Sequence, residues 1–156
     1  MHSSKDEIFN EKKKALRSTL SFLKAIKKNV TKSKAIEIAN DAAANFMISI
    51  YRDVFEGTKP STQKRFDAFR NFYENHPKTS PYCEILESTS KTLKVVFHRC
   101  PYAEILKEED LFEFANSSCL SDLVFTKKLL PNVSFKRERS IVKGDNQCVM
   151  LWRKEN

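Results

Sequence analysis

Three cysteines in the second half of the chain, Cys100, Cys119 and Cys148, are the residues best suited to chemistry. Cys100 lies where an alternating strand pattern stops and a helical pattern starts, and Pro101 follows it. Because proline suits the first position of a helix, Cys100 is expected at the N-terminal end of a short helix. The free N–H groups and the dipole at such an end favour thiolate over thiol. The position predicts a nucleophile with a lowered pKa; the alternative is a cysteine that packs as a small hydrophobic residue.

Acidic and basic side chains stand at spacings that bring them toward these thiols. Asp122 follows Cys119 by three residues on a predicted helix, so the two share one face. Glu104 follows Cys100 by one helical turn, and His98 shares the strand face of Cys100. Each of these groups can move a proton for a thiol nucleophile. Taken singly, each is also an ordinary core or surface residue.

Two arginines are candidates for holding a substrate. Arg137 and Arg139 alternate along a predicted strand and are therefore expected on one face. A guanidinium group binds a carboxylate through two parallel hydrogen bonds. The pair is expected to hold a substrate carboxylate. The alternative, if their strand lies at a sheet edge, is that both arginines are ordinary surface residues.

Other site chemistries fit the sequence less well. The three cysteines with Asp122 or His98 are zinc-ligand types, but no C-x₂-C or H-x₃-H pair occurs. We therefore predict no metal and no cofactor, with zinc as the minor alternative. The chain has only two glycines and no G-x-S-x-G motif, which argues against a Gly-rich nucleotide loop and a serine-hydrolase elbow.

Apolar residues at helical spacing predict three helices in the first half of the chain. We expect them at 6–29, from Thr31 or Ser33 to Gly57, and from Ser61 to His76. Thr31, Ser33 and Ser61 are hydroxyl residues of the kind that cap helix N-termini.

The second half alternates between strand and helix patterns. Strands are expected at 82–88, 91–99, 133–142 and 147–153, and helices at 101–108 and 111–130, the latter capped by Asp110. The fold class is therefore α+β: N-terminal helices followed by a four-stranded, mainly antiparallel sheet in ββααββ order with packed helices. We expect a single domain over 1–156, with a helical part at 1–77 and an α+β part at 80–156 that carries the cysteines.

The net charge of +8 is concentrated at the start of the chain. Residues 1–34 hold 10 Lys and Arg against 3 Asp and Glu, and the rest of the chain is nearly neutral. We interpret this as a solvated helix face, with nucleic-acid binding as the less favoured alternative. The N-terminal helices can also pair with a second copy of the chain. No apolar run is long enough for a membrane span and no signal-peptide pattern is present, so a cytoplasmic protein with reduced cysteines is expected.

The C-terminal part resembles the L-2-amino-thiazoline-4-carboxylic acid hydrolase family. The resemblance covers residues 97–153 and rests on an ordered set of motifs: Arg99-Cys100-Pro101-Tyr102-Ala103-Glu104, then Leu111, Cys119-Leu120-Ser121-Asp122, Pro131, Arg137, Gly144, Cys148 and Arg153. It implies an enzyme that opens a cyclic isothiourea by hydrolysis to give a carbamoyl-cysteine. It also implies that Cys100, Glu104, Cys119, Asp122 and Cys148 converge. The chain departs from the family's usual ending after Cys148.

Two functions follow as hypotheses. The first is a cysteine-dependent hydrolase of a small C–N or C–S ring, in which Cys100 attacks and Glu104 or Asp122 moves protons. Its substrate contacts are expected from His98, Tyr102, Arg137 and Arg139. The second, motivated by the departure after Cys148, is a non-catalytic domain that binds or senses a small molecule in the same pocket.

Overall fold

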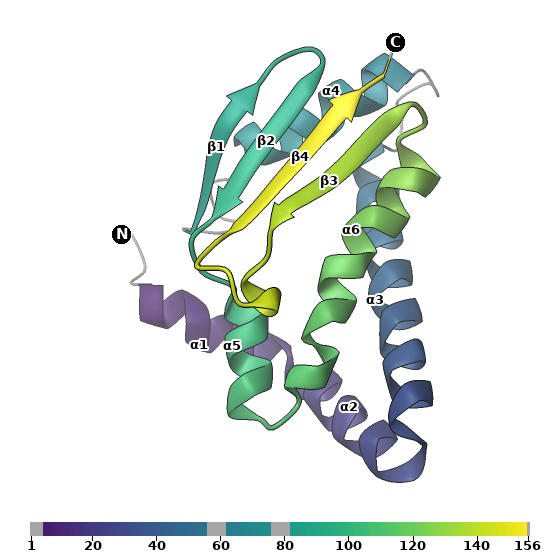
Figure 1. Ribbon diagram of the computed structural model, residues 1–156, viewed down its shortest axis with the longest axis vertical. Helices are drawn as coiled ribbons and strands as arrows, with labels where there is room; N and C mark the ends of the chain where they lie inside the picture. Colours follow the sequence, from purple (N-terminus) through teal and green to yellow (C-terminus); the bar gives the residue numbers. More distant parts are fainter. Residues whose placement is uncertain (1–4, 56–61, 76–81, 156) are drawn as a thin grey trace.

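The computed structural model describes residues 5–55, 62–75 and 82–155, and it confirms the α+β fold class (Figure 1). Within these residues the chain forms six α-helices, two short 3₁₀ turns and one four-stranded sheet. None of the described helices is long and apolar enough to cross a bilayer.

The sheet has the strand order β1-β2-β4-β3, and all neighbouring strands are antiparallel, as predicted. Its strands are β1 (Cys83–Ser88), β2 (Thr92–Phe97), β3 (Val133–Arg139) and β4 (Cys148–Lys154). The two central strands are the most apolar, and Phe97 at the end of β2 pairs with Cys148 at the start of β4. The position of Cys148, one of the three candidate cysteines, is therefore determined by the register of the two central strands.

Three helices cover one face of the sheet: α3 (Lys32–Phe55), α4 (Thr62–Asn75) and α6 (Ala115–Leu129) (Figure 1). They bury a cluster that we call the sheet core, which contains rings from all three helices and Trp152 of β4. Tyr51 stacks on Phe125 with ring centroids 4.3 Å apart, and Phe69 meets Trp152 edge-on at 5.1 Å. Aromatic pairs of this geometry add to the free energy gained from area burial.

A second cluster, the helical core, lies beyond the end of the sheet. It joins α2 (Arg17–Asn29), the N-terminal half of α3, α5 (Pro101–Glu108) and the 3₁₀ turn η1 (Phe112–Phe114). Leu23, Ala35, Ile105 and Phe114 are among its buried members. The interior of the described chain thus consists of two apolar clusters rather than one.

The N-terminal segment forms two helices where a single helix over 6–29 was predicted. The helix α1 (Lys5–Ala15) ends one residue before α2 begins, with Leu16 between them. No glycine or proline marks this break. We attribute it to tertiary packing, because α1 contacts α5 whereas α2 packs against α3.

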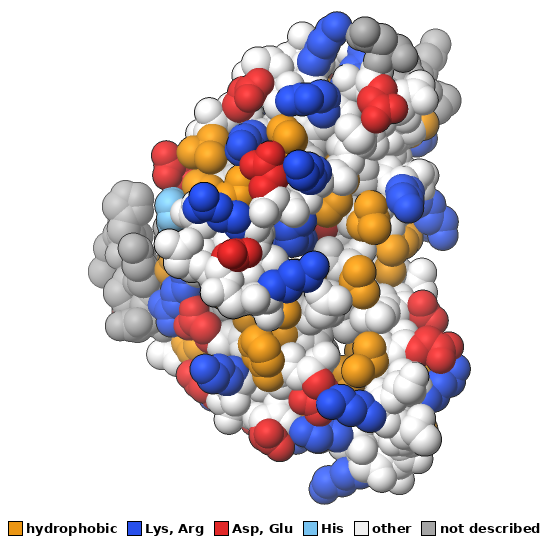
Figure 2. All heavy atoms as spheres, viewed as in Figure 1, with side chains coloured by type: hydrophobic (Ala, Val, Ile, Leu, Met, Phe, Trp, Pro, Cys, Tyr) orange, Lys and Arg blue, Asp and Glu red, His pale blue; other side chains and the backbone are white. Residues whose placement is uncertain are grey.

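The basic N-terminal segment docks on an acidic one. Lys13, Lys24 and Lys27 pair with carboxylates at the end of α5 and in η1, namely Glu108, Glu109, Asp110 and Glu113. Figure 2 shows Lys/Arg and Asp/Glu side chains intermingled at the lower end of the molecule. Part of the charge expected to face solvent is therefore balanced within the chain.

Two predicted boundaries were wrong. Asp110 does not cap a helix over 111–130: it has a φ of +56° and its exposed carboxylate pairs with Lys27. The chain first makes η1 and then α6, so the long helix is shorter than predicted. The strand predicted at 133–142 ends at Arg139 and is followed by a 3₁₀ turn, η2 (Ile141–Lys143).

Some of the other predicted boundaries lie within the described residues, and the rest lie outside them. Thr31, not Ser33, precedes α3, and its Oγ1 accepts a hydrogen bond from the Lys34 amide at 3.4 Å. Gly144 follows η2 with a φ of 102°, a left-handed conformation that glycine adopts without steric cost. The predicted stop at Gly57, the cap at Ser61 and the stop at His76 lie outside the described residues.

Candidate active site

Most of the predicted site residues meet in one pocket of about 480 Å³ at the junction of the two cores. We call it the cysteine pocket; it is lined by Cys100, Cys119 and Cys148 together with Lys12, Asp122 and Arg137. Apolar side chains from both cores, such as Met150 and Ile105, complete its walls. Residues as far apart in the sequence as Lys12 and Met150 are therefore brought to one surface by the fold.

Cys100 occupies the predicted position at the start of α5. It is the N-cap residue, and Pro101 is the first residue of the helix. The expected lowering of its pKa is wrong, however, because burial raises the pKa of the thiol to about 11. The backbone amide of Ala103 lowers it only in part. Loss of hydration here outweighs the helix N-terminus, so Cys100 is a neutral thiol at neutral pH.

The other two thiols reach the pocket from different elements. Cys119 lies on α6, and Cys148 is the first residue of β4, where its Sγ accepts a hydrogen bond from the Ile141 amide at 3.2 Å. Burial raises the pKa of Cys119, and Arg137 acts against this rise. All four cysteines of the chain are unbridged. Cys83 lies apart from the pocket, half-buried against the sheet core, as predicted.

Asp122 is held by an ion pair with Arg137 in the wall of the cysteine pocket. The guanidinium also donates to the backbone oxygen of Cys119 at 3.3 Å, so one arginine contacts two positions of α6. Burial raises the pKa of Asp122 to about 6, although Arg137 favours the ionised form. Asp122 is thus largely buried, and its proton can be exchanged near neutral pH.

Arg137 and Arg139 do not share a face, which corrects the prediction. Arg137 pairs with Met150 on β4, and Arg139 pairs with the adjacent Val149. The bulge between the two arginines inserts one extra residue and reverses the alternation. Only Arg137 lines the pocket, and Arg139 is exposed.

Glu104 and His98 are not among the residues that line the pocket. Glu104 accepts two hydrogen bonds from Nε of Arg99, both at 2.8 Å. His98 lies one residue beyond β2, is exposed, and contacts Glu84 with its Nε2 at 3.1 Å. Arg99, which Glu104 holds, does line the pocket, so Glu104 reaches it through this neighbour.

Two further pocket residues complete the site. Tyr102 lines it as predicted, and burial raises the pKa of its hydroxyl. Lys12 of α1 was missed by the sequence analysis. It is half-buried, burial lowers the pKa of its ammonium group, and the Cys100 thiolate acts in the opposite direction. Its signal was present in the sequence, since Lys12 interrupts the apolar series Ile8, Leu16 and Leu20 at a spacing of four.

The donor set does not form a metal centre in the part of the chain that the structure describes. No group of three or more His, Cys, Asp or Glu side chains there is arranged to hold an ion. The three thiols instead share their pocket with three cations, Lys12, Arg99 and Arg137, and with the carboxylate of Asp122. This arrangement suits nucleophilic and proton-transfer chemistry on a small molecule.

Comparison with known proteins supports a family and a fold. A family model described as L-2-amino-thiazoline-4-carboxylic acid hydrolase matches residues 10–152, nearly the whole chain. No curated protein matches. Among solved structures, the chain is similar to a trafficking protein particle complex subunit 3 from Naegleria fowleri covalently bound to palmitic acid. The TM-score is 0.52 at 12% identity, over 94% of this chain and 97% of that one, so the likeness concerns the fold.

Proposed function

Because the chain belongs to the L-2-amino-thiazoline-4-carboxylic acid hydrolase family, we propose that its cysteine pocket is the active site of a hydrolase for small C–N or C–S rings. The observation that carries this proposal is the convergence of Cys100, Cys119, Cys148 and Asp122 on one pocket. These residues come from three different elements and are the ones that the family motifs single out.

Cys100 is the nucleophile in this proposal. Its Sγ attacks the ring carbon that lies between nitrogen and sulfur, the ring C–S bond breaks, and the thiol proton ends on the released sulfur. Since one thiol replaces another, the high pKa of Cys100 imposes no net cost on this exchange. The ammonium group of Lys12 stabilises the Cys100 thiolate while the exchange takes place.

Asp122 is the proton carrier for the second half of the reaction. Above about pH 6 its carboxylate is ionised and accepts a proton from the attacking water. The water oxygen bonds to the same carbon, Cys100 leaves, and Asp122 returns the proton to its sulfur. One water is consumed, and the product is an open-chain carbamoyl compound. Arg137 orients Asp122 and is the arginine that we assign to the substrate carboxylate.

The test is turnover of L-2-amino-thiazoline-4-carboxylate by the wild-type protein and by Cys100→Ser. We expect the wild-type protein to release a carbamoyl-cysteine, whose new thiol comes from the opened ring. Cys100→Ser is expected to react at least about 100-fold more slowly, which is the loss typical of removing one catalytic group. Cys83→Ser is the matched control because that thiol lies outside the pocket. Equal rates for Cys100→Ser and Cys83→Ser would remove Cys100 from the mechanism.

A second candidate function is non-catalytic binding of an apolar ligand in the same pocket. It is favoured by the raised pKa values of Cys100 and Cys119 and by the apolar walls. The N. fowleri protein of similar fold is described as covalently bound to palmitic acid. A fatty acid that raises the melting temperature, in a protein that releases no product from the thiazoline, supports this candidate over the hydrolase.

A further inference from the structure

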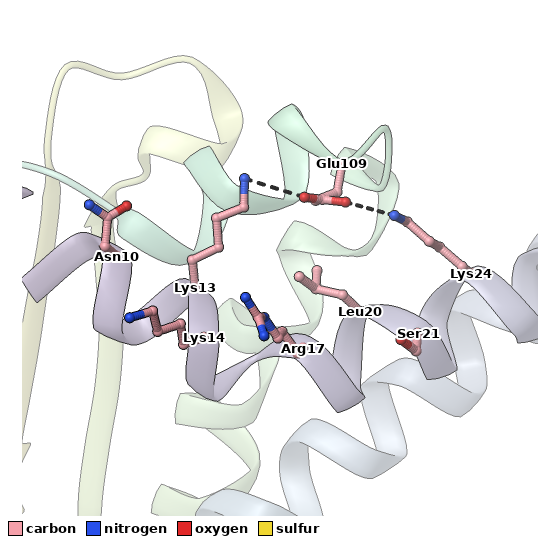
Figure 3. Close-up of a pocket in the computed structure, with 8 residues that line it drawn as sticks. All are labelled: Asn10, Lys13, Lys14, Arg17, Leu20, Ser21, Lys24 and Glu109. Carbon is pink, nitrogen blue, oxygen red and sulfur yellow. Dashed lines mark hydrogen bonds and ion pairs between the residues drawn. The ribbon is translucent and has the colours of Figure 1, made fainter.

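A second hollow, of about 620 Å³, lies on the outer side of α1 and α2, away from the cysteines. We call it the basic hollow; its charged lining residues are Lys13, Lys14, Arg17, Lys24 and Glu109 (Figure 3). None of these residues lines the cysteine pocket. The hollow is therefore a separate feature that the proposed hydrolase does not use.

The lining comes from one continuous face of two helices. Asn10, Lys13, Arg17, Ser21 and Lys24 follow one another at spacings of three and four residues. Residues at these spacings lie above one another on a helix. The break at Leu16 does not interrupt the row, so α1 and α2 together present a strip of hydrogen-bond donors.

Glu109 of the α5 end fixes two of the cations in place. Its carboxylate accepts Lys24 Nζ at 2.6 Å and lies 3.3 Å from Lys13 Nζ. Lys13 Nζ also lies 2.7 Å from Glu108. Four cations thus surround two carboxylates, which leaves an excess of two positive charges at the hollow.

The excess is carried by Arg17 and Lys14. Neither forms an ion pair with any residue in the described ranges 5–55, 62–75 and 82–155. Figure 3 shows the Arg17 guanidinium directed into the space bordered by Lys13, Glu109 and Leu20, with Lys14 at the rim. An exposed arginine directed over a concave surface, beside the ion-paired ammonium groups of Lys13 and Lys24, is arranged to receive an anion with several oxygens.

We propose that the basic hollow binds the phosphate group of a phosphate ester. A phosphate dianion matches the excess charge of two. Its oxygens can accept two parallel hydrogen bonds from the Arg17 guanidinium, together with hydrogen bonds from the neighbouring ammonium groups of Lys13 and Lys14. A single carboxylate would leave one charge and several donors unmatched. The phosphate group belongs either to a soluble ester or to a lipid headgroup.

In the first experiment, the full-length protein is titrated with inorganic phosphate and with glycerol 3-phosphate at low ionic strength, and the heat of binding is measured by calorimetry. We expect saturable binding that weakens with added salt, and about a tenfold or greater loss of affinity in Arg17→Gln. Lys28→Gln is the matched control, because it removes one exposed positive charge from the same helix outside the hollow. Equal affinities for Arg17→Gln and Lys28→Gln would overturn the proposal.

The second experiment distinguishes the two sources of the phosphate. Vesicles of phosphatidylcholine with and without phosphatidic acid are mixed with the wild-type protein and both variants, and bound protein is measured after sedimentation. Binding that requires phosphatidic acid and Arg17 identifies a lipid headgroup, and saturable binding of glycerol 3-phosphate alone identifies a soluble ester. Absence of Arg17-dependent binding in both experiments contradicts the proposal. This result is independent of hydrolysis, which is measured at the other pocket.

Discussion

Arg137 on β3 and Asp122 on α6 form an ion pair whose side chains are 15% and 14% exposed. The pair ties the edge strand of the sheet to the helix that carries Cys119. It also places a largely buried carboxylate in the wall of the cysteine pocket. A charged pair in this position is costly to break, because either partner left alone remains buried without its counter-charge.

Replacement of Arg137 by methionine is therefore expected to destabilise the protein. The substitution keeps much of the side-chain volume but leaves Asp122 unpaired, and we expect a loss of about 3 kcal/mol in the free energy of unfolding. The measurement is urea unfolding of both proteins at neutral pH. Arg139→Met is the control, since Arg139 is exposed, and its loss is expected to stay within about 0.5 kcal/mol. Similar losses for the two variants would contradict the burial assigned to Arg137.

The pKa of Asp122 predicts how stability depends on pH. The carboxyl has a pKa of about 6 in the folded protein, whereas an ordinary aspartate has a pKa of 3.8. The folded chain therefore keeps this proton at pH values where the unfolded chain has lost it. By linkage, this group's contribution to stability is greatest below about pH 4, falls as the pH rises toward about 6, and is constant above that value.

Asp122→Asn isolates this contribution. The amide does not titrate, so the difference in free energy of unfolding between the variant and the wild type is expected to change between about pH 4 and pH 6. Other carboxyl groups titrate in both proteins and cancel in the difference. A difference that is flat over this range would show that burial does not raise the pKa of Asp122.

Lys12 is expected to control the reactivity of Cys100. Because the thiolate and the ammonium group stabilise each other, Lys12→Met should raise the pKa of Cys100 and slow its alkylation. The measurement is the rate of iodoacetamide labelling of the Cys100 peptide as a function of pH. Lys28→Met removes an exposed charge and should leave the profile unchanged. An unchanged labelling profile in Lys12→Met would show that Lys12 does not affect the reactivity of the Cys100 thiol.

A hydrogen bond between Trp152 and Thr126 is expected to stabilise the sheet core. The indole N–H donates to Thr126 Oγ1 at 2.9 Å, and that hydroxyl donates to the backbone oxygen of Asp122 at 2.6 Å. Thr126→Val keeps the shape and leaves the buried indole N–H without an acceptor, which costs about 1–3 kcal/mol. Thermal unfolding of this variant and of Thr19→Val, at an exposed position of α2, measures the difference. Equal melting temperatures would rule out a stabilising role for this bond.

Local signals in the sequence predicted the parts of the fold that depend on neighbouring residues. Alternation identified the four strands, and the Pro101 position placed Cys100 at the start of α5, as observed. The antiparallel sheet followed from the same patterns. These features are determined within a few residues, so a single sequence carries them.

Features that depend on tertiary contacts could not be predicted in this way. The bulge that separates Arg137 from Arg139 arises from the pairing of β3 with β4. The raised pKa of Cys100 reflects burial by distant elements, which the helix N-terminus does not overcome. Asp122 is buried because Arg137 lies opposite it, fifteen residues away in the chain. Each of these depends on which segments meet rather than on local spacing.

The position of the cysteine pocket between the sheet core and the helical core has a consequence for its dynamics. Two packed clusters such as the sheet core and the helical core can move slightly apart at their boundary without either of them unfolding. A molecule bound in the cysteine pocket contacts both cores, so it is expected to couple their unfolding into a single transition.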